Sequence, residues 1–416
     1  MERNKRDDLL VIFLGIILAY LMYLIVLSEL SRTLSDYNGH TYIYLPLFKR
    51  DSWIEGWKAV PYCMWHLSVL GLNRLLHIPL ETSAAYVSSL SQLFAYFVIY
   101  WMLRRYTEAK GVALGAGRAA GIAFGLSVAQ ALYFDWLDTG DRFVGTFSIN
   151  PVHNPTHMCM RPFALICFCL VCDIWGKQKD EGYKGIFFQV ERGLKRYYIY
   201  LAAALFLSSM AKPVFAEMFI PAVGLVMLVE WFVRIRRKDG SGSAYFQHCL
   251  TTLLCAVPSL VYILLQFLAY FFWGGSYEAD GSFMVTKWME VWRLYTENVT
   301  LSIVLGMAFP LFLVLIDGGF FVREDMGRLA LTGYAVGLLE AASLGEGGEK
   351  LSHGDFLWPM MCGMLLMWMT AMMRLLVLER TQTDSKGKRA LVNVAWVLFC
   401  IHVLCGLLYF KELIGI

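Results

Sequence analysis

Residues 9–30 read LLVIFLGIILAYLMYLIVLSEL and hold a single charged side chain, Glu29, close to their end. A run of this length, wound as a helix, crosses the roughly 30 Å hydrocarbon core of a bilayer. Comparable apolar runs recur along the chain, in which hydrophobic residues make up 58% and charged residues only 17%, with a mean hydropathy of +0.54. This balance excludes an ordinary soluble protein and predicts an all-α, polytopic integral membrane protein.

The apolar runs predict about eleven membrane-spanning helices. The division between the fifth and the sixth is the weakest, because only Lys212 and Pro213 mark a turn there. No linker rich in Pro, Ser or Gly and no internal repeat is present, so residues 1–416 are expected to form one membrane domain without a separate soluble domain. The expected spans are 9–30, 83–103, 112–133, 158–175, 197–211, 213–233, 249–273, 299–316, 329–345, 357–378 and 391–410.

The distribution of basic residues predicts the orientation. With the N-terminus inside, the cytoplasmic segments hold 22 Lys and Arg residues and the outer segments hold 11, as the positive-inside rule requires. Segment 61–78 is also fairly apolar, but counting it as a span would reverse this bias. We therefore expect it to be interfacial or re-entrant within a long outer loop, 31–82, that carries interfacial helices. The Met-, Cys- and Tyr-rich spans are typical of a bacterial plasma membrane protein.

Charge and cysteine content exclude several other classes. The net charge of +3 reflects membrane anchors and topology signals rather than a nucleic-acid surface. Most of the ten cysteines fall within spans, where cysteine serves as a small hydrophobic residue, and no pair of CxxC motifs recurs at zinc spacing. We therefore expect no metal ligands, no cofactor and no nucleic-acid partner, although a divalent metal is left open.

Candidate functional residues gather on the predicted outer side, which also holds six of the eight histidines. The first group follows the first span, where Asp36 and His40 lie among tyrosines in the stretch SDYNGHTY, 35–42. A carboxylate at headgroup level is partly shielded from water and can serve as a general base. The alternative is a solvated aspartate beside a turn. The six histidines are His40, His66, His77, His153, His157 and His353.

The second group lies before the fourth span, in the stretch NPVHNPTH, 150–157. Two prolines four residues apart predict a fixed non-helical path, along which His153, Asn154 and His157 could contact substrate or brace the loop. Arg161 then lies just inside the span, where an unpaired cation is costly. It either extends outward to water or binds an anion.

The third and fourth groups are loops at the same boundary. Lys212 lies in the tight turn after the fifth span, where it could bind an anion or simply pair with Glu217. The glycine-rich stretch 345–355 holds Glu349, His353 and Asp355. It is interpreted as a flexible, charged lid, with a solvated loop as the alternative.

In its architecture the chain resembles the GT-C superfamily of polytopic glycosyltransferases. The likeness consists of about eleven spans, a long first outer loop with interfacial helices, and an acid directly after the first span. The resemblance implies that Asp36 is the catalytic base, that the donor is a polyprenyl-phosphate-linked sugar, and that Arg161 and Lys212 bind the donor phosphate. It implies a glycan, lipid or protein acceptor on the extracytoplasmic face. The resemblance also implies an inverting transfer. Asn38 stands where many members carry a second acid, which favours a mechanism without a metal.

Two other functions stay open at this point. A glycan polymerase or ligase acting on lipid-linked saccharides would use similar residues. A transporter of small molecules or lipids would usually place ionisable residues near the bilayer midplane and show inverted repeats, whereas here the polar residues gather at one boundary. Of the three functions, sugar transfer by a glycosyltransferase is the one we expect.

Overall fold

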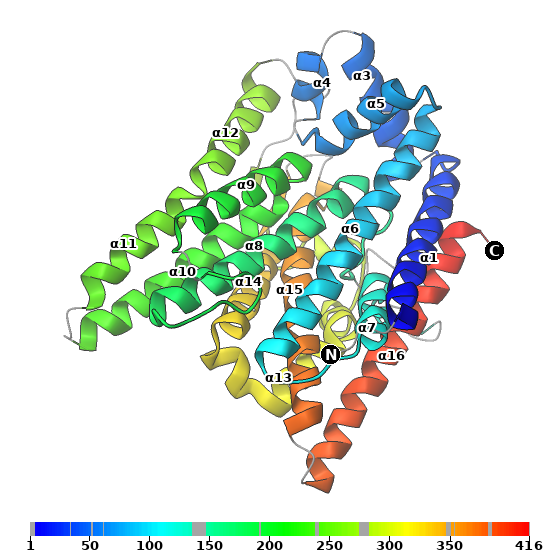
Figure 1. Ribbon diagram of the computed structural model, residues 1–416. Coiled ribbons are helices and arrows are strands. Elements are labelled where there is room, and N and C mark those ends of the chain that lie inside the picture. The colour runs from blue at the N-terminus through cyan, green and yellow to red at the C-terminus, as the bar shows by residue number, and fades with distance from the viewer. Residues whose placement is uncertain are drawn as a thin grey trace.

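Helices make up most of the residues that the structure describes, so the predicted all-α class is confirmed (Figure 1). The structure is a computed structural model. It describes residues 5–33, 35–50, 53–60, 62–134, 147–190, 193–237, 241–273, 283–346, 351–352, 354–381 and 385–415.

Within these residues, seven helices are long and apolar enough to cross a membrane. An eighth crossing is possible where α11 (Ser241–Leu254) and α12 (Val257–Phe272) meet, because the two are bent by 41° at a short break. These helices identify an integral membrane protein. The seven are α1 (Lys5–Leu30), α6 (Leu80–Ala109), α8 (Pro155–Lys179), α10 (Val214–Arg237), α13 (Val299–Arg323), α15 (Trp358–Thr381) and α16 (Lys386–Ile414).

The predicted count of eleven spans is not confirmed. Each predicted span overlaps helical residues, although 249–273 falls on the two helices α11 and α12. Helices α7 (Ala116–Val128), α9 (Lys195–Ala211) and α14 (Asp325–Ser343) do not meet the length and hydropathy that a crossing requires. At 1.5 Å per residue, α7 is only about 20 Å long. Helix α14 carries three charged side chains, each of which is partly buried.

Helices α8 and α15 form the centre of the bundle. In their apolar windows 89% and 94% of residues are buried, against 33% to 56% in the other spanning helices. Helix α15 packs closely on α14, because a Cβ on Gly363 would lie 2.6 Å from Cα of Tyr334. A polar side chain in the buried part of α8, such as Arg161, therefore faces protein rather than lipid.

The loop after α1 folds into short helices gathered beyond one end of the bundle, at the top of Figure 1. Segment 61–78 forms α5 (Met64–Leu76), which is too short to cross a bilayer, as predicted. The small sheet joins β1 (Phe283–Val285) to β2 (Leu344–Glu346), and two 3₁₀ turns, η2 (Trp292–Leu294) and η4 (Asp355–Leu357), lie in the same loops. The other short helices are α2 (Asp36–Asn38), the π-helix η1 (Gly39–Tyr44), α3 (Leu45–Arg50) and α4 (Trp53–Ala59).

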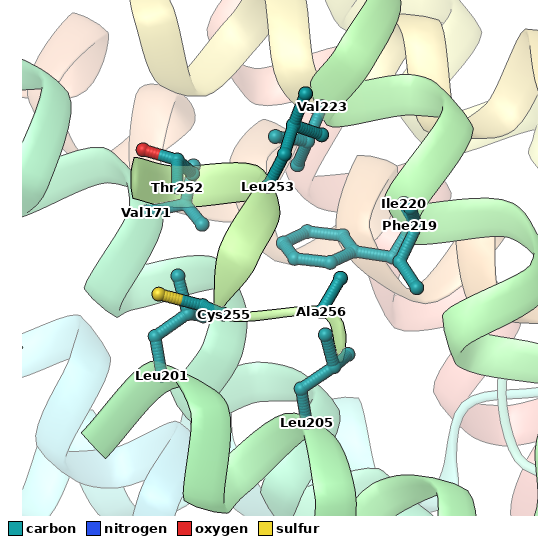
Figure 2. Close-up of a pocket in the computed structure, with 10 residues that line it drawn as sticks. All are labelled: Val171, Leu201, Leu205, Phe219, Ile220, Val223, Thr252, Leu253, Cys255 and Ala256. Atoms are coloured by element: carbon teal, nitrogen blue, oxygen red, sulfur yellow. The ribbon is translucent and has the colours of Figure 1, made fainter. Parts of the chain in front are cut away.

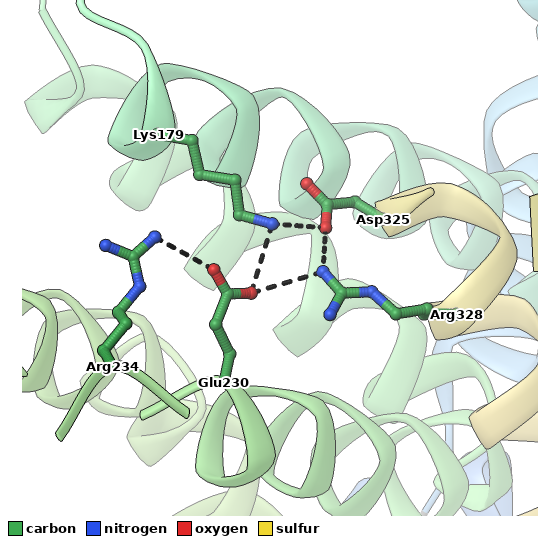
Figure 3. A network of polar contacts seen from close by, with 5 residues as sticks. All are labelled: Lys179, Glu230, Arg234, Asp325 and Arg328. Carbon is green, nitrogen blue, oxygen red and sulfur yellow. Dashed lines mark hydrogen bonds and ion pairs between the residues drawn. The ribbon is translucent and has the colours of Figure 1, made fainter. Parts of the chain in front are cut away.

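An ion-pair network ties three helices together at the opposite end of the bundle (Figure 3). Glu230 of α10 accepts from Lys179 at 3.1 Å, from Arg234 at 3.0 Å and from Arg328 at 3.3 Å. Asp325, at the start of α14, binds both Lys179 and Arg328. The network joins the last turns of α8 and α10 to α14, and its side chains are mostly shielded from solvent, which strengthens such pairs.

Asp173 fixes the loop between α8 and α9 near the same end. Its buried carboxylate accepts the backbone N–H groups of Ile186, Phe187 and Phe188 at 2.7, 2.9 and 2.6 Å. It also accepts the hydroxyl of Tyr183 at 2.8 Å. Four donors converge on one side chain, so the path of the loop depends on it.

The substitution Asp173→Asn is expected to lower the free energy of unfolding by about 2–3 kcal/mol. The new amide would turn an N–H group toward N–H donors and leave at least one of them without an acceptor. Unfolding of the purified protein in mixed micelles with increasing dodecyl sulfate measures the change. Asp180→Asn is the control, because Asp180 is exposed and accepts a single backbone N–H, that of Gly182 at 2.8 Å. Equal losses in both variants would contradict this role of Asp173.

Candidate functional site

The predicted polar residues meet where α8, α10 and α15 begin and α9 ends. Asn154 joins them, because it caps α8 and its Oδ1 accepts the backbone N–H of His157 at 2.9 Å. Its side chain also donates to Oδ2 of Asp36 at 2.7 Å and accepts from Nζ of Lys212 at 3.3 Å. One asparagine thus connects three segments that are far apart in the sequence.

The local fold of this segment differs in part from the prediction. Residues 147–154 are non-helical, as the prolines indicate, but α8 begins at Pro155 itself. Asparagine is favoured at the N-cap and proline at the first helical position, so the pair Asn154-Pro155 starts a helix rather than preventing one. His157 therefore lies on the first turn of α8, one turn above Arg161.

Asp36 is held at the start of α2, directly beyond the end of α1. Ser35 caps this turn by accepting the backbone N–H of Asn38 at 3.1 Å. The Asp36 carboxylate is half-buried, and its Oδ1 makes no hydrogen bond within the part of the chain that the structure describes. Asn38 donates instead to the carbonyl of Leu30 at 3.0 Å. One oxygen of Asp36 is positioned by Asn154 and the other can accept a proton.

Lys212 is buried, with 6% of its surface exposed. Its Nζ lies 3.9 Å from the ring centroid of Trp358, at the start of α15, in a cation–π contact. Burial lowers the pKa of Lys212, and the nearby carboxylates of Asp355 and Asp36 act in the opposite direction. The alternative pairing with Glu217 is not formed, since no described carboxylate lies within ion-pair distance of Lys212. The ammonium group is held by an amide and a ring, and an anion could still approach it.

His153 and His157 pack around the same tryptophan. Their rings lie 6.0 and 5.3 Å from the ring of Trp358, measured between centroids. Burial lowers the pKa of His153, and Asp36 opposes this shift. Trp358 therefore contacts three of the predicted site residues, namely Lys212, His153 and His157.

A buried histidine pair adjoins this group. Nδ1 of His40 lies 3.0 Å from Nε2 of His66, which belongs to α5. One ring donates its proton to the other, which requires the accepting ring to be neutral. Burial lowers the pKa of His66 to about 3 and that of His40 well below its ordinary value.

This pair predicts loss of stability in acid. A histidine whose folded pKa lies below its unfolded pKa contributes stability above pH 6.5, and that stability is lost as pH falls toward the folded value. For His66 the loss between pH 7 and pH 5 is about 2 kcal/mol. Thermal unfolding in detergent at the two pH values measures it. His66→Gln should reduce the difference, whereas His77→Asn, at an exposed position on the same loop, should not. An unchanged difference in His66→Gln would refute the assignment.

Arg161 is fully buried on α8 and does not extend outward to water. Its Nη1 donates to Oε1 of Gln92 at 3.3 Å, while Nε and Nη2 have no hydrogen-bond partner among the described residues. His157 and Cys362 each lie within electrostatic range of both Arg161 and Lys212. A buried guanidinium without a carboxylate partner is costly unless an anion binds there.

The predicted lid is only partly described. Asp355 begins η4, is exposed, and acts electrostatically on Lys212. Glu349 and His353 lie outside the described residues. Within the described ranges no three His, Cys, Asp or Glu side chains are arranged to hold a metal ion.

A small cavity elsewhere is a poor candidate for chemistry (Figure 2). It lies beside the break between α11 and α12, has a volume of about 20 Å³, and is lined mainly by aliphatic side chains and Phe219. Thr252 and Cys255 are its polar members, and none of the predicted site residues reaches it. The cavity accommodates the bend rather than a substrate.

Three residues that contact the candidate site residues were not predicted as part of the site. They are Trp358, His66 and Gln92. His66 was grouped with the outer histidines but not assigned to the site. In the sequence, Trp358 is one of many aromatic residues near the ends of spans, and Gln92 is an isolated polar residue within a span. The signal that could have identified Gln92 is its place within a span, where a polar side chain needs a partner.

Comparisons with known proteins give no relative. No family model matches the chain, and no curated protein or solved structure matches it. The resemblance to the GT-C superfamily therefore stays a prediction from the sequence.

Proposed function

We propose that the protein is an inverting membrane glycosyltransferase, which moves a sugar from a polyprenyl-phosphate donor to a glycan, lipid or protein acceptor. The observation that carries the proposal is the hydrogen-bonded unit formed by Asp36, Asn154 and Lys212. It places a proton acceptor and a cation on the two sides of one amide, at the end of the helical bundle.

In the proposed reaction Asp36 is the general base. Its Oδ1 takes the proton of an acceptor hydroxyl as that oxygen forms a bond to the anomeric carbon of the donor. The bond between this carbon and the phosphate oxygen breaks at the same time, and the phosphate leaves with the electron pair. A single displacement of this kind inverts the configuration at the anomeric carbon. Asn154 positions Asp36 and does not itself exchange a proton.

The leaving phosphate needs cations at the same boundary. Lys212 supplies one next to Asp36, and Arg161 supplies a second about 9 Å deeper along α8, six residues from its start. A polyprenyl phosphate carries its charge at headgroup level and its chain in the lipid, so the two cations suit its head better than a soluble sugar nucleotide. Contacts between such cations and phosphate are strong in a buried site.

The remaining residues would shape the sugar and acceptor sites. Trp358 offers an aromatic face, and His153 and His157 offer ring nitrogens beside it. His40, which pairs with His66, lies within electrostatic range of Lys212. Asp355, with Glu349 and His353 of the same loop, would contact the sugar or cover it. From the predicted orientation we expect this face to lie outside the cytoplasm, and from the composition of the spans we expect a bacterial cell envelope. The proposal needs no metal for the chemical step, though a divalent ion stays compatible with it.

Mass spectrometry of lipid-linked and surface glycans tests the proposal, in cells of the source organism with and without the gene. We expect one glycan to lose a single sugar in the deletion, and the wild type to restore it. Asp36→Asn, present at wild-type levels in the membrane, should not restore it. Loss of a whole polymer, with its repeat unit intact, would favour a polymerase or ligase. Restoration by Asp36→Asn, or no change in any glycan, would overturn the proposal and favour a transporter.

A further inference from the structure

A second polar surface lies at the opposite end of the bundle from the candidate site. It is an open groove of about 560 Å³ between the last turns of α6, the loop before α9 and the first turns of α9. Five aromatic side chains, two arginines and one glutamine line it. This groove has no part in the proposed sugar transfer.

Aromatic rings form fixed walls of the groove. Trp101 of α6 packs against Phe188 with ring centroids 5.0 Å apart and against Phe187 at 6.0 Å. The backbone N–H groups of Phe187 and Phe188 donate to the carboxylate of Asp173, which fixes this loop. Gly185 turns the loop with a φ of +94°, and a Cβ there would lie 1.7 Å from the carbonyl oxygen of Phe188. The walls are therefore set by the fold without a ligand.

The two arginines give the groove a positive charge. Nε of Arg105 donates to the carbonyl of Phe187 at 3.3 Å, and Nη2 of Arg196 donates to the carbonyl of Gln189 at 3.1 Å. Nη2 of Arg196 also donates to the hydroxyl of Tyr197 at 2.7 Å, whereas Nε and Nη1 make no hydrogen bond within the described ranges. No described carboxylate lines the groove. Glu108 pairs with Arg105 at 3.5 Å from outside the groove, but it is highly exposed and such pairs are weak.

A neighbouring cavity at the same end has a smaller excess of positive charge, because carboxylates line it as well. It has a volume of about 280 Å³ and is lined by Lys110, Arg323 and Arg374 together with two carboxylates. One of these, Asp317, binds Arg374 at 2.5 Å. An anion is therefore attracted to the first groove more than to the second, although both lie beside the end of α6.

We propose that the groove binds the headgroup of an anionic phospholipid, with the phosphate between Arg105 and Arg196. The glycerol and the upper acyl chains would lie on Trp101 and on Tyr200, which is 52% exposed. Tryptophan and tyrosine favour this level of a membrane, and basic pockets between helix ends bind anionic lipids. The aromatic walls distinguish a lipid from a soluble phosphate, which would need polar walls.

Native mass spectrometry of the detergent-purified full-length protein, titrated with lipid, tests the proposal. The probes are dioleoyl phosphatidylglycerol and dioleoyl phosphatidylcholine, which share the same chains. We expect the wild type to bind the anionic phosphatidylglycerol more tightly than the zwitterionic phosphatidylcholine. The double variant Arg105→Gln, Arg196→Gln should bind it about 30-fold more weakly, since each cation near a headgroup contributes about a factor of five.

The neighbouring cavity supplies a matched control. Lys110→Gln with Arg323→Gln removes two charges at the same membrane boundary and should leave the affinity within about twofold. If the double variant misfolds, Arg196→Lys takes its place in the test. It keeps the charge and should retain most of the binding. Equal binding of both lipids by the wild type, or equal losses in both double variants, would overturn the proposal. Competition by glycerol phosphate at the lipid's own concentration would assign the groove to a soluble anion instead.

Discussion

The substitution Asp36→Asn should lower the rate of sugar transfer by a factor of about 10²–10⁴ and leave the fold intact. Asparagine has the shape of aspartate, and its side-chain oxygen can still accept the 2.7 Å hydrogen bond from Asn154. What it lacks is a lone pair basic enough to take the proton of an acceptor hydroxyl. Single-turnover transfer from a synthetic polyprenyl-phosphate sugar, once the donor is identified from the glycan change, measures the rate.

The control for this variant is another acid of the same loop. Glu55 is exposed and paired with Lys58 at 3.0 Å, away from Asn154, so Glu55→Gln should transfer sugar at the wild-type rate. Donor binding should change little in Asp36→Asn, because the phosphate contacts belong to Arg161 and Lys212. A variant that retains half of the wild-type rate would exclude Asp36 as the base. A large loss of donor binding with an unchanged chemical step would give it a binding role instead.

The substitution Arg161→Met is expected to separate stability from function. A buried charge with one hydrogen-bonded nitrogen costs free energy in the protein without ligand, so methionine should leave the stability unchanged or raise it by about 1–4 kcal/mol. The same change removes a charge-assisted contact of about 1.5–3 kcal/mol, which weakens binding of polyprenyl phosphate by about 10- to 150-fold. Thermal unfolding without ligand and titration with the phosphate measure the two effects.

A paired arginine provides the contrast. Arg374 of α15 binds Asp317 at 2.5 Å, so Arg374→Met leaves that carboxylate without its partner and should destabilise the protein. It should not affect binding of the lipid phosphate. If Arg161→Met is instead as unstable as Arg374→Met and binds the phosphate normally, Arg161 has a structural role and the phosphate site lies elsewhere. Arg161→Lys should show intermediate binding, because lysine keeps the charge but not the planar geometry.

Much of the fold follows from the sequence. Apolar runs can only be helices in a bilayer, since every backbone polar group must be satisfied within the segment. The runs therefore locate α1, α6, α8, α10, α13, α15 and α16, and the basic residues indicate that segment 61–78 is not a span. The count of eleven was less secure, because an apolar run does not say whether its helix crosses the membrane. Whether α7, α9 and α14 cross depends on how they pack against neighbours that the sequence does not identify.

The residues of the candidate site follow from the sequence only as a group. Spans of alternating direction bring the segments around Asp36, Asn154, Lys212 and Asp355 to the same end, so their gathering was predictable. Their partners were not. Whether Lys212 pairs with Glu217 or contacts Trp358 depends on side-chain packing, and so does the burial of Arg161 against Gln92.

The sequence by itself thus determined the class of protein, the helical segments and the end at which polar residues collect, because hydropathy and charge act locally along the chain. The tertiary structure alone decided that α8 and α15 lie at the centre, that Asn154 joins Asp36 to Lys212, and that His40 meets His66. These contacts join residues up to 118 positions apart. They depend on how helices fit against one another, which is a property of their surfaces in three dimensions and not of their order in the sequence.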